Sequence, residues 1–364
     1  MRTPVLRRRA IIVTAVALAV LLPAGTAFAC GGLVAPNGTI SLTRTTTLAA
    51  YHDGNEHYVT SFEFAGGEGE FGSIIPLPGI PTKVIRGGDW TLQRLVLETQ
   101  PQPRAVAEFA AVDASLGAAE VILTTEIDAL DIVVLKGGAD AVGKWAIDHG
   151  FFLPPDAPEV LDFYADRSPI FMTVRFNADR ADEQGLQQGD GTPVHVVIPT
   201  ENPWVPLRIL GLGAGAIAPV EADVYLLTDH APALLPDPVS PGEARFVTEN
   251  GFHPGLVLEQ SRPASETLLT DLRSDKGMQW LPTDDMWLSY VRVDAEAGHL
   301  DFDLAVDASG AGKPSPVDAG LSASTSRPVT GGGGVELMWL VAAAIVVLGI
   351  GLWTAQRRPA GRPA

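Results

Sequence analysis

Alternating apolar and polar residues dominate the middle of the chain and predict a protein built mainly of β-strands. In the run 58–64, large and aromatic side chains at even positions alternate with smaller or more polar residues. A Thr-rich apolar run, 39–51, precedes it, and Asp53-Gly54 between the two runs is typical of a tight hairpin turn. We therefore expect a hairpin there. Further strands are expected at 73–78, 120–125, 130–136, 170–176, 194–199, 205–210, 223–228, 286–293 and 299–306.

Helical patterns are fewer and shorter. We expect one helix at 90–98 behind Asp89 as N-cap and one at 141–149 behind Asp140. Two more are expected at 104–112 and 157–164. Strands interrupted by a few short helices predict an α+β fold with predominantly antiparallel sheet over residues 30–306, as one large domain or two intimate subdomains.

The first 29 residues predict an export signal. Arg7–Arg9 form a basic start, 10–22 is almost wholly apolar, and Ala27-Phe28-Ala29 is an A-x-A cleavage site. Cleavage between Ala29 and Cys30 would make Cys30 the first mature residue. Its place leaves two alternatives open, a lipidated cysteine or a free or intermolecularly paired thiol.

The other end of the chain predicts a membrane anchor. Residues 335–355 would form a helix about 31 Å long, which matches the hydrocarbon core of a bilayer. Trp339 and Trp353 stand near its ends, and Arg357 and Arg358 begin a basic tail, 356–364. Interfacial tryptophans and cytoplasmic arginines predict a single-pass protein whose N-terminal domain lies outside the cytoplasm.

A spacer is expected between the body and this helix. Residues 307–334 are rich in Pro, Gly and Ser and poor in large apolar side chains, which is typical of a flexible linker. Its end contains Arg327-Pro328-Val329-Thr330-Gly331, which resembles the Leu-Pro-x-Thr-Gly sorting signal except for the arginine. Sortase attachment to the cell wall therefore stays open as an alternative to the membrane as final location.

The chain is strongly acidic, with 43 Asp and Glu against 25 Lys and Arg among 364 residues. The signal and the tail contain arginines but no acids, so the negative charge belongs to the exported body. This charge argues against a nucleic acid as partner, because proteins bind the phosphate backbone through basic surfaces. The single cysteine excludes an internal disulfide framework.

Several segments resemble the bacterial domain of unknown function 2330 family over about residues 29–306. The similar segments are Ala29–Gly32, Phe71–Pro78, Trp145–Pro154, Val205–Ile209 and Trp287–Arg292. The resemblance implies an uncharacterised secreted or membrane-anchored protein. It implies no activity and no catalytic residues.

The densest polar cluster is His52, Asp53, Glu56 and His57, which could ligate zinc. The same residues fall on the expected hairpin tip, where Asp, Gly and Asn serve the turn, so the sequence assigns no metal. It also contains no motif for a cofactor, because the glycines of 211–215 lack dinucleotide spacing and precede an expected strand. The segment 177–183 fails as a calcium loop and is expected to be a solvated loop.

No nucleophile motif stands out, and the sequence favours a binding or structural role over catalysis. The expected partners are the lipid bilayer, through the C-terminal helix, and an envelope protein or glycan. The alternative is an extracellular hydrolase whose site is assembled from residues distant in sequence. Asp229-His230 and Asp284-Asp285 are weak candidates for such a site, and solvated loop ends are their default interpretation. The tryptophans at 204, 280 and 287 could line a ligand groove, although core packing is their more common use.

Overall fold

The computed structural model describes residues 32–34, 45–62, 72–99, 119–185, 191–249 and 255–321. Its centre is the expected hairpin of β2 (Thr45–His52) and β3 (Asn55–Phe62). Asp53 and Gly54 at the turn have φ values of 50° and 74°. Asp-Gly is a favoured pair for this two-residue turn because both positions require positive φ. The predicted hairpin is therefore confirmed.

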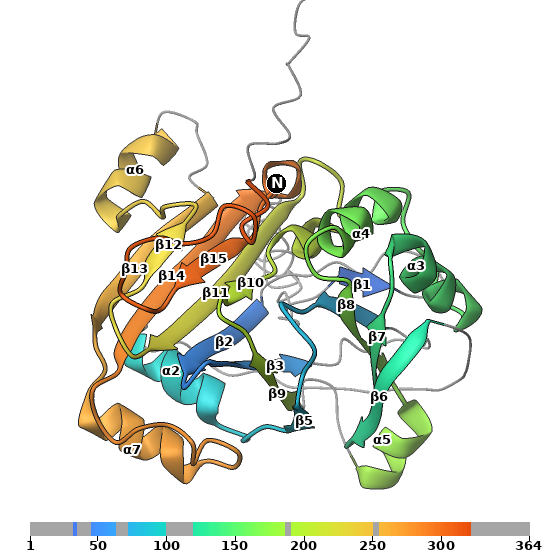
Figure 1. The fold of residues 1–364 in the computed structure, drawn as a ribbon, viewed down its shortest axis with the longest axis horizontal. Helices are drawn as coiled ribbons and strands as arrows, with labels where there is room; N and C mark the ends of the chain where they lie inside the picture. The colour runs from blue at the N-terminus through green and yellow to red at the C-terminus, as the bar shows by residue number, and fades with distance from the viewer. Residues whose placement is uncertain are drawn as a thin grey trace, which may run out of the picture. The chain divides into compact units, whose positions relative to one another are not determined.

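The hairpin lies within a seven-stranded sheet of order β13-β14-β11-β2-β3-β9-β5 (Figure 1). The β2–β11 pair is parallel and the other neighbours in this sheet are antiparallel. Its remaining strands are β5 (Lys83–Arg86), β9 (Thr192–Pro199), β11 (Pro219–Thr228), β13 (Gly255–Pro263) and β14 (Trp287–Glu296).

Two smaller antiparallel sheets complete the β structure. The five-stranded sheet has the order β1-β4-β8-β7-β6, and the three-stranded sheet has the order β10-β15-β12. The strands of the five-stranded sheet are β1 (Gly32–Val34), β4 (Gly72–Pro76), β6 (Glu120–Ile127), β7 (Leu130–Lys136) and β8 (Ile170–Phe176). Those of the three-stranded sheet are β10 (Trp204–Val205), β12 (Ala233–Leu235) and β15 (Leu304–Asp307).

Short helices cover the sheets (Figure 1). They are α2 (Thr91–Thr99), α3 (Ala139–Asp148), α4 (Ala157–Ala165), α5 (Ala178–Gln184), α6 (Pro241–Glu249) and α7 (Glu266–Ser274). One face of the seven-stranded sheet shares a small core with α2 and α7. The opposite face shares a larger core with the five-stranded sheet, α3 and α4. Mostly antiparallel sheets with few short helices confirm the predicted α+β class.

Two expected strands are shorter than their sequence patterns predict. Residues 205–210 give only the end of β10 and then the 3-10 helix η1 (Arg208–Gly211). The amides of Leu207 and Arg208 donate to the Asp303 carboxylate instead of a strand neighbour, which explains the change. Residues 299–306 likewise begin in the 3-10 helix η2 (Ala297–His299) before β15.

The segment 177–183 is a helix and not the expected loop. The Asn177 side chain accepts a hydrogen bond from the Arg180 amide at 3.0 Å and so caps the start of α5.

The expected helix caps were also wrong in detail. The backbone amides of Trp90 and Thr91 donate to Asp275, and Asp89 pairs with Arg86 instead. The N-cap of α3 is Gly138, and Asp140 lies in the first turn. Asp275 lies far away in sequence, so no local pattern could have identified it as the cap of α2.

The folded body extends past the expected boundary at 306. Residues up to Leu321 belong to one compact unit. Ala319 is fully buried, and its carbonyl accepts a hydrogen bond from the Asp303 amide at 3.0 Å. The first part of the expected linker is therefore packed against the body. Backbone hydrogen bonds hold it there, although it has few large apolar side chains to bury.

The remainder of the chain, 322–364, lies outside the described residues and contains the predicted membrane helix 335–355. The expected helix 104–112 lies in the undescribed segment 100–118. Within the described ranges, no helix is both long enough and apolar enough to span a bilayer.

Candidate functional site

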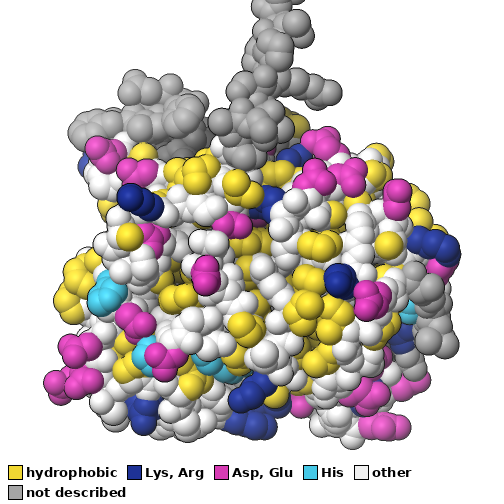
Figure 2. All heavy atoms as spheres, in the orientation of Figure 1, with side chains coloured by type: hydrophobic (Ala, Val, Ile, Leu, Met, Phe, Trp, Pro, Cys, Tyr) yellow, Lys and Arg dark blue, Asp and Glu magenta, His cyan; other side chains and the backbone are white. Residues whose placement is uncertain are grey.

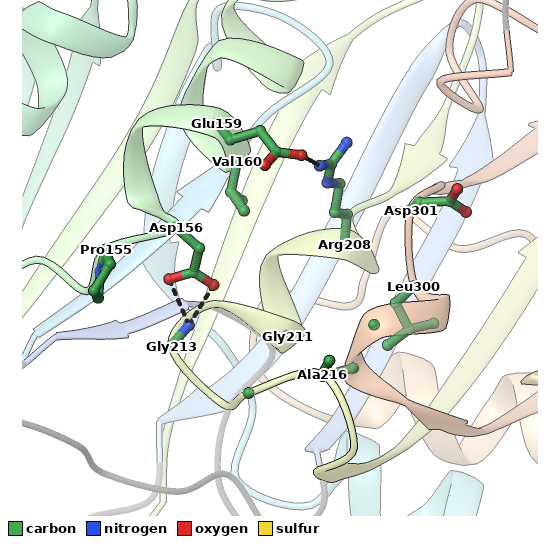
Figure 3. Close-up of a pocket in the computed structure, with 13 residues that line it drawn as sticks. Pro155, Asp156, Glu159, Val160, Arg208, Gly211, Gly213, Ala216, Leu300 and Asp301 are labelled. Carbon is green, nitrogen blue, oxygen red and sulfur yellow. Dashed lines mark hydrogen bonds and ion pairs between the residues drawn. The ribbon is translucent and has the colours of Figure 1, made fainter. Parts of the chain in front are cut away.

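Figure 3 shows a cleft between the start of α4, the loop after η1 and the region of η2. We call it the α4 cleft. Its volume is about 560 Å³, within the range of small-molecule sites. Small residues form much of its wall, and its charged side chains are three acids and one arginine. The lining residues are Pro155, Asp156, Glu159, Val160, Arg208, Gly211, Gly213, Gly215, Ala216, Ala297, Gly298, Leu300 and Asp301.

Main-chain hydrogen bonds fix the walls of the α4 cleft. The Asp156 carboxylate accepts from the Gly213 amide, with Oδ2 at 2.9 Å (Figure 3). The Gly298 amide donates to the carbonyl of Ala216 at 2.8 Å. A Cβ at position 298 would lie 2.9 Å from that oxygen, so only glycine allows this close approach. The cleft is therefore pre-formed by contacts within the chain.

Arg208 is the cation of the cleft. Its guanidinium carbon lies 4.4 Å from the centroid of the Phe163 ring, and the two groups make a cation–π contact. Its Nη2 lies 2.5 Å from Oε1 of Glu159 (Figure 3). The Arg208 side chain is 18% exposed and that of Glu159 is 78% exposed. The arginine is thus largely covered, whereas its acidic partner is mostly exposed to solvent.

A buried carboxylate anchors the wall that carries Arg208. Oδ1 of Asp303 accepts hydrogen bonds from the Tyr164 hydroxyl at 2.8 Å and from the backbone amides of Leu207 and Arg208 at 2.7 and 3.1 Å. Oδ2 lies 2.5 Å from Nη2 of Arg167. Burial raises the pKa of the Asp303 carboxyl, and these donors oppose that rise. Because every partner is a donor, the site is built for the carboxylate form.

A second cavity of about 530 Å³ lies beside β5 and the end of β6. Its arginine, Arg86, is already paired with Asp89 and Asp128, each at 2.6 Å. The α4 cleft differs because its arginine pairs with one described acid, Glu159, whereas Arg86 pairs with two.

The polar cluster predicted from the hairpin is divided by the sheet. His57 pairs with Ala50 and Glu56 with Tyr51, so the two neighbours point to opposite faces of β3. His52 shares the face of His57, whereas Asp53 at the turn is 87% exposed. The four residues do not converge on one point. Across the described part of the chain, no three His, Cys, Asp or Glu side chains are grouped to hold a metal ion.

His57 instead joins a buried aromatic group. Its Nδ1 lies 2.9 Å from Nε2 of His195 on β9, and its ring stacks on Trp280 with centroids 3.4 Å apart. We call His52, His57, His195 and Trp280 the histidine cluster. Burial and, to a lesser extent, the nearby His195 lower the pKa of His57 to about 3. Burial lowers the pKa of His195 to about 4. Both rings are therefore neutral at physiological pH.

His52 is the accessible member of the histidine cluster. Its Nδ1 lies 2.7 Å from Oδ1 of Asp229, and the two side chains are 27% and 36% exposed. The pair joins residues 177 positions apart. An imidazole oriented by a carboxylate is an arrangement that general bases use.

Glu56 faces the larger core and is fully buried. Among the residues that the structure describes, neither carboxylate oxygen has a hydrogen-bond partner. Burial raises the pKa of Glu56 to about 8. The side chain is therefore mainly protonated at neutral pH.

The other predicted site residues lie outside the described residues. These are the cleavage and lipidation site at Ala29 and Cys30, the sorting-like motif 327–331, and the expected membrane anchors at Trp339, Trp353, Arg357 and Arg358.

A family comparison places the chain among known sequences. Residues 23–237 match the model of a family described as "uncharacterized protein conserved in bacteria (DUF2330)", which is more than half of the chain. The chain belongs to this family. The resemblance expected from the sequence is confirmed, although the expected segment 287–292 lies beyond the match. The match includes Arg208, Glu159 and the Gly213 loop, whereas the η2 wall of the α4 cleft lies beyond it.

Other comparisons add little. No curated protein matches the chain. Baculovirus P35 is similar at 10% identity, with a TM-score of 0.36, over 73% of this chain and 96% of P35. A mutated baculovirus P35 after caspase cleavage is similar at 10% identity, with a TM-score of 0.32, over 61% and 77%. At these scores the likeness carries no argument about fold or function.

The α4 cleft was not predicted from the sequence. Its residues come from three separate segments, 155–160, 208–216 and 297–301, and each looks like an ordinary loop or helix. The run of glycines at 211–215 was the only available signal, and it did not fit a nucleotide-binding loop.

Proposed function

We propose that this protein is exported, anchored by its C-terminal helix, and binds a small ligand of the bacterial envelope in the α4 cleft. The signal and helix patterns of the sequence support the location. The observation that carries the binding role is the cleft itself, a pre-formed cavity with one supported arginine whose acidic partner is exposed. The acidic side chains spread over the surface in Figure 2 suit a soluble domain outside the cell.

Binding is favoured over catalysis by what lines the α4 cleft. Within the described structure, the lining contains no Ser, Thr, Cys, His or Lys, and two of its three carboxylates, Asp156 and Glu159, are already paired with the Gly213 amide and with Arg208. Its polar groups are instead arranged at separate points of the wall, as in sites that orient a ligand.

Filling the cleft tests this role. Ala216 lines the cleft and is exposed, so Ala216→Trp should block it without disturbing the core. Ala214 is exposed on the same loop but does not line the cleft, so Ala214→Trp is the matched control. The full chain in detergent micelles would be sedimented with purified bacterial cell walls. We expect wild type and Ala214→Trp to co-sediment and Ala216→Trp to remain in solution; equal behaviour of the two variants would refute the cleft as the binding site.

The location has its own test. A protease added to intact cells should remove the body up to about Leu321, because the proposed topology places it outside. A body that is degraded only after lysis would contradict this topology. If the wall is the final location, Thr330→Ala should abolish wall attachment. If the helix is the anchor, this substitution should change nothing.

A hydrolase is the second candidate function, and the His52–Asp229 pair is the observation that favours it. The pair is partly exposed and oriented as a general base would be. Among the described residues, no Ser, Thr or Cys side chain donates to His52, so such a hydrolase would activate water directly. His52→Ala should abolish hydrolysis of an envelope substrate if this candidate is correct.

A further inference from the structure

We propose that the α4 cleft recognises a short peptide with a free amino group and a free carboxylate, through Asp301 and Arg208 respectively. The inference rests on the proposed function, because it names the ligand class of the same cleft.

Arg208 provides the site for a carboxylate. The Phe163 ring and the buried Asp303 fix its position, since Asp303 holds the Arg208 backbone amide. Only Nη2 of its guanidinium is paired, with Glu159, whereas Nε and Nη1 make no hydrogen bond to a described residue. A guanidinium binds a carboxylate through two parallel hydrogen bonds, so spare nitrogens on a fixed arginine suit this ligand group.

Asp301 provides the complementary charge. It follows η2 and lines the cleft from a different element than Arg208 does, with its carboxylate directed away from Arg208 (Figure 3). Its side chain is exposed and has no ion-pair or hydrogen-bond partner among the residues that the structure describes. The cleft thus offers a free anion and an available cation on separate parts of its wall. Two charges of opposite sign specify a zwitterion rather than a simple cation or anion.

The remaining lining favours a peptide over a sugar. No aromatic side chain is among the residues that line the cleft, so the face of a sugar ring would find no stacking partner there. Gly215 has nothing within 4 Å of an added Cβ, which leaves open space above its backbone. The larger apolar side chains that line the cleft are those of Val160 and Leu300. Bare backbone and a few apolar side chains suit a short chain of small residues.

The test is titration calorimetry of the full chain in detergent micelles with three probes. They are trialanine, its N-acetylated form and its C-terminal amide. Trialanine should bind, and blocking either end should weaken binding about tenfold, because each block removes one charge. Binding of all three probes with equal affinity, or of none, would overturn the inference.

Two variants assign the ends. Asp301→Asn should lower the affinity for trialanine about tenfold. Its affinity for the N-acetylated form should be no lower than that of wild type. Arg208→Gln should show the same pattern with the C-terminal amide. Asp284→Asn, an exposed acid outside the cleft, should leave every affinity unchanged. Equal losses for all three probes in both variants would contradict the assignment of ends.

The ligand class and the binding site are tested by different outcomes. If Ala216→Trp abolishes cell-wall binding but trialanine does not bind, the ligand class is wrong and the cleft remains the site. Binding of chitotriose, a neutral sugar, in place of trialanine would overturn the peptide class in favour of a glycan. If Ala216→Trp has no effect on either ligand, the proposed function fails as well.

Discussion

The α4 cleft and the histidine cluster both bring together polar residues from distant segments, but they treat charge in opposite ways. In the cleft, Arg208 is presented at the surface and is supported by a buried carboxylate with four donors. In the histidine cluster, His57 and His195 are buried, and burial lowers the pKa of each so that both are neutral. Glu56 lies on the opposite face of β3 from His57 and is mainly neutral as well, because burial raises its pKa.

This difference separates a site from a core. A side chain can recognise a charged ligand only if its own charge is maintained and reachable, and the cleft meets both conditions. In the histidine cluster, His57 and His195 are neither charged nor accessible. The hairpin segment 52–57 is nevertheless the part of the sequence richest in candidate metal ligands. The density of polar residues along the chain is therefore a poor guide to function when a strand alternates them between two cores.

The largest effect is expected from removing the charge that supports the cleft. Asp303→Asn leaves Arg167, only 7% exposed, without an anion, and should lower the free energy of unfolding by about 3–5 kcal/mol. Urea unfolding of the full chain in micelles measures it. The nearby exposed Asp301→Asn should change stability by less than about 0.5 kcal/mol and serves as control. If both substitutions lowered the free energy of unfolding equally, Asp303 would not differ from an exposed surface acid in its contribution to stability.

The next effect concerns Glu56 and depends on pH. Its pKa is about 8 in the folded protein against 4.5 for the free side chain, so the folded state binds more protons between these values. Its contribution is full below about pH 4.5 and is lost as pH rises through 8. Glu56→Gln should therefore gain up to about 3 kcal/mol relative to wild type between pH 5 and 8.5. A stability difference that is the same at both pH values would mean that Glu56 is ionised in the core.

The histidines should show the opposite slope. Their pKa values of about 3 and 4 lie below the free value of 6.5, so their contribution is present above pH 6.5 and is lost as pH falls. His57→Gln keeps a hydrogen-bonding side chain but cannot titrate. Relative to wild type, it should gain about 1–2 kcal/mol between pH 7 and pH 5. A loss of stability of His57→Gln relative to wild type over this range would show that His57 is protonated in the folded protein. The histidine cluster would then hold a charge, as the α4 cleft does.

The smallest effect is expected at the exposed partner of Arg208. Glu159→Gln should change the free energy of unfolding by less than about 0.5 kcal/mol, because Glu159 is 78% exposed and such pairs contribute little. A loss comparable to that of Asp303→Asn would mean that the pair is structural. Glu159 would then not be free to exchange with a ligand.

Local patterns predicted much of the fold. The turn at Asp53-Gly54 and the period-two runs around it gave the hairpin, and most other strands agree within a few residues because alternation directly reflects one buried face. The errors at η1 and at the cap of α2 depended on distant residues, whereas α5 was missed although its capping residue, Asn177, is local. Asp303 turns part of an expected strand into η1, and Asp275 caps α2, and neither effect is visible in the local sequence.

The candidate site could be predicted far less well. The four residues His52, Asp53, Glu56 and His57 were adjacent in sequence, but strand geometry sends two of them to opposite faces. The cleft depends on the packing of three segments through backbone contacts such as that between Gly298 and Ala216. Backbone contacts leave almost no side-chain signature, so a single sequence gives little indication of them.

One measurement compares the two regions directly. Cell-wall co-sedimentation of the full chain would be quantified for Ala216→Trp, which fills the cleft, and for His52→Ala, which breaks the pair with Asp229. We predict that Ala216→Trp loses binding and His52→Ala retains it at the wild-type level. Loss of binding in His52→Ala with full binding in Ala216→Trp would contradict the account and place the functional site at the histidine cluster.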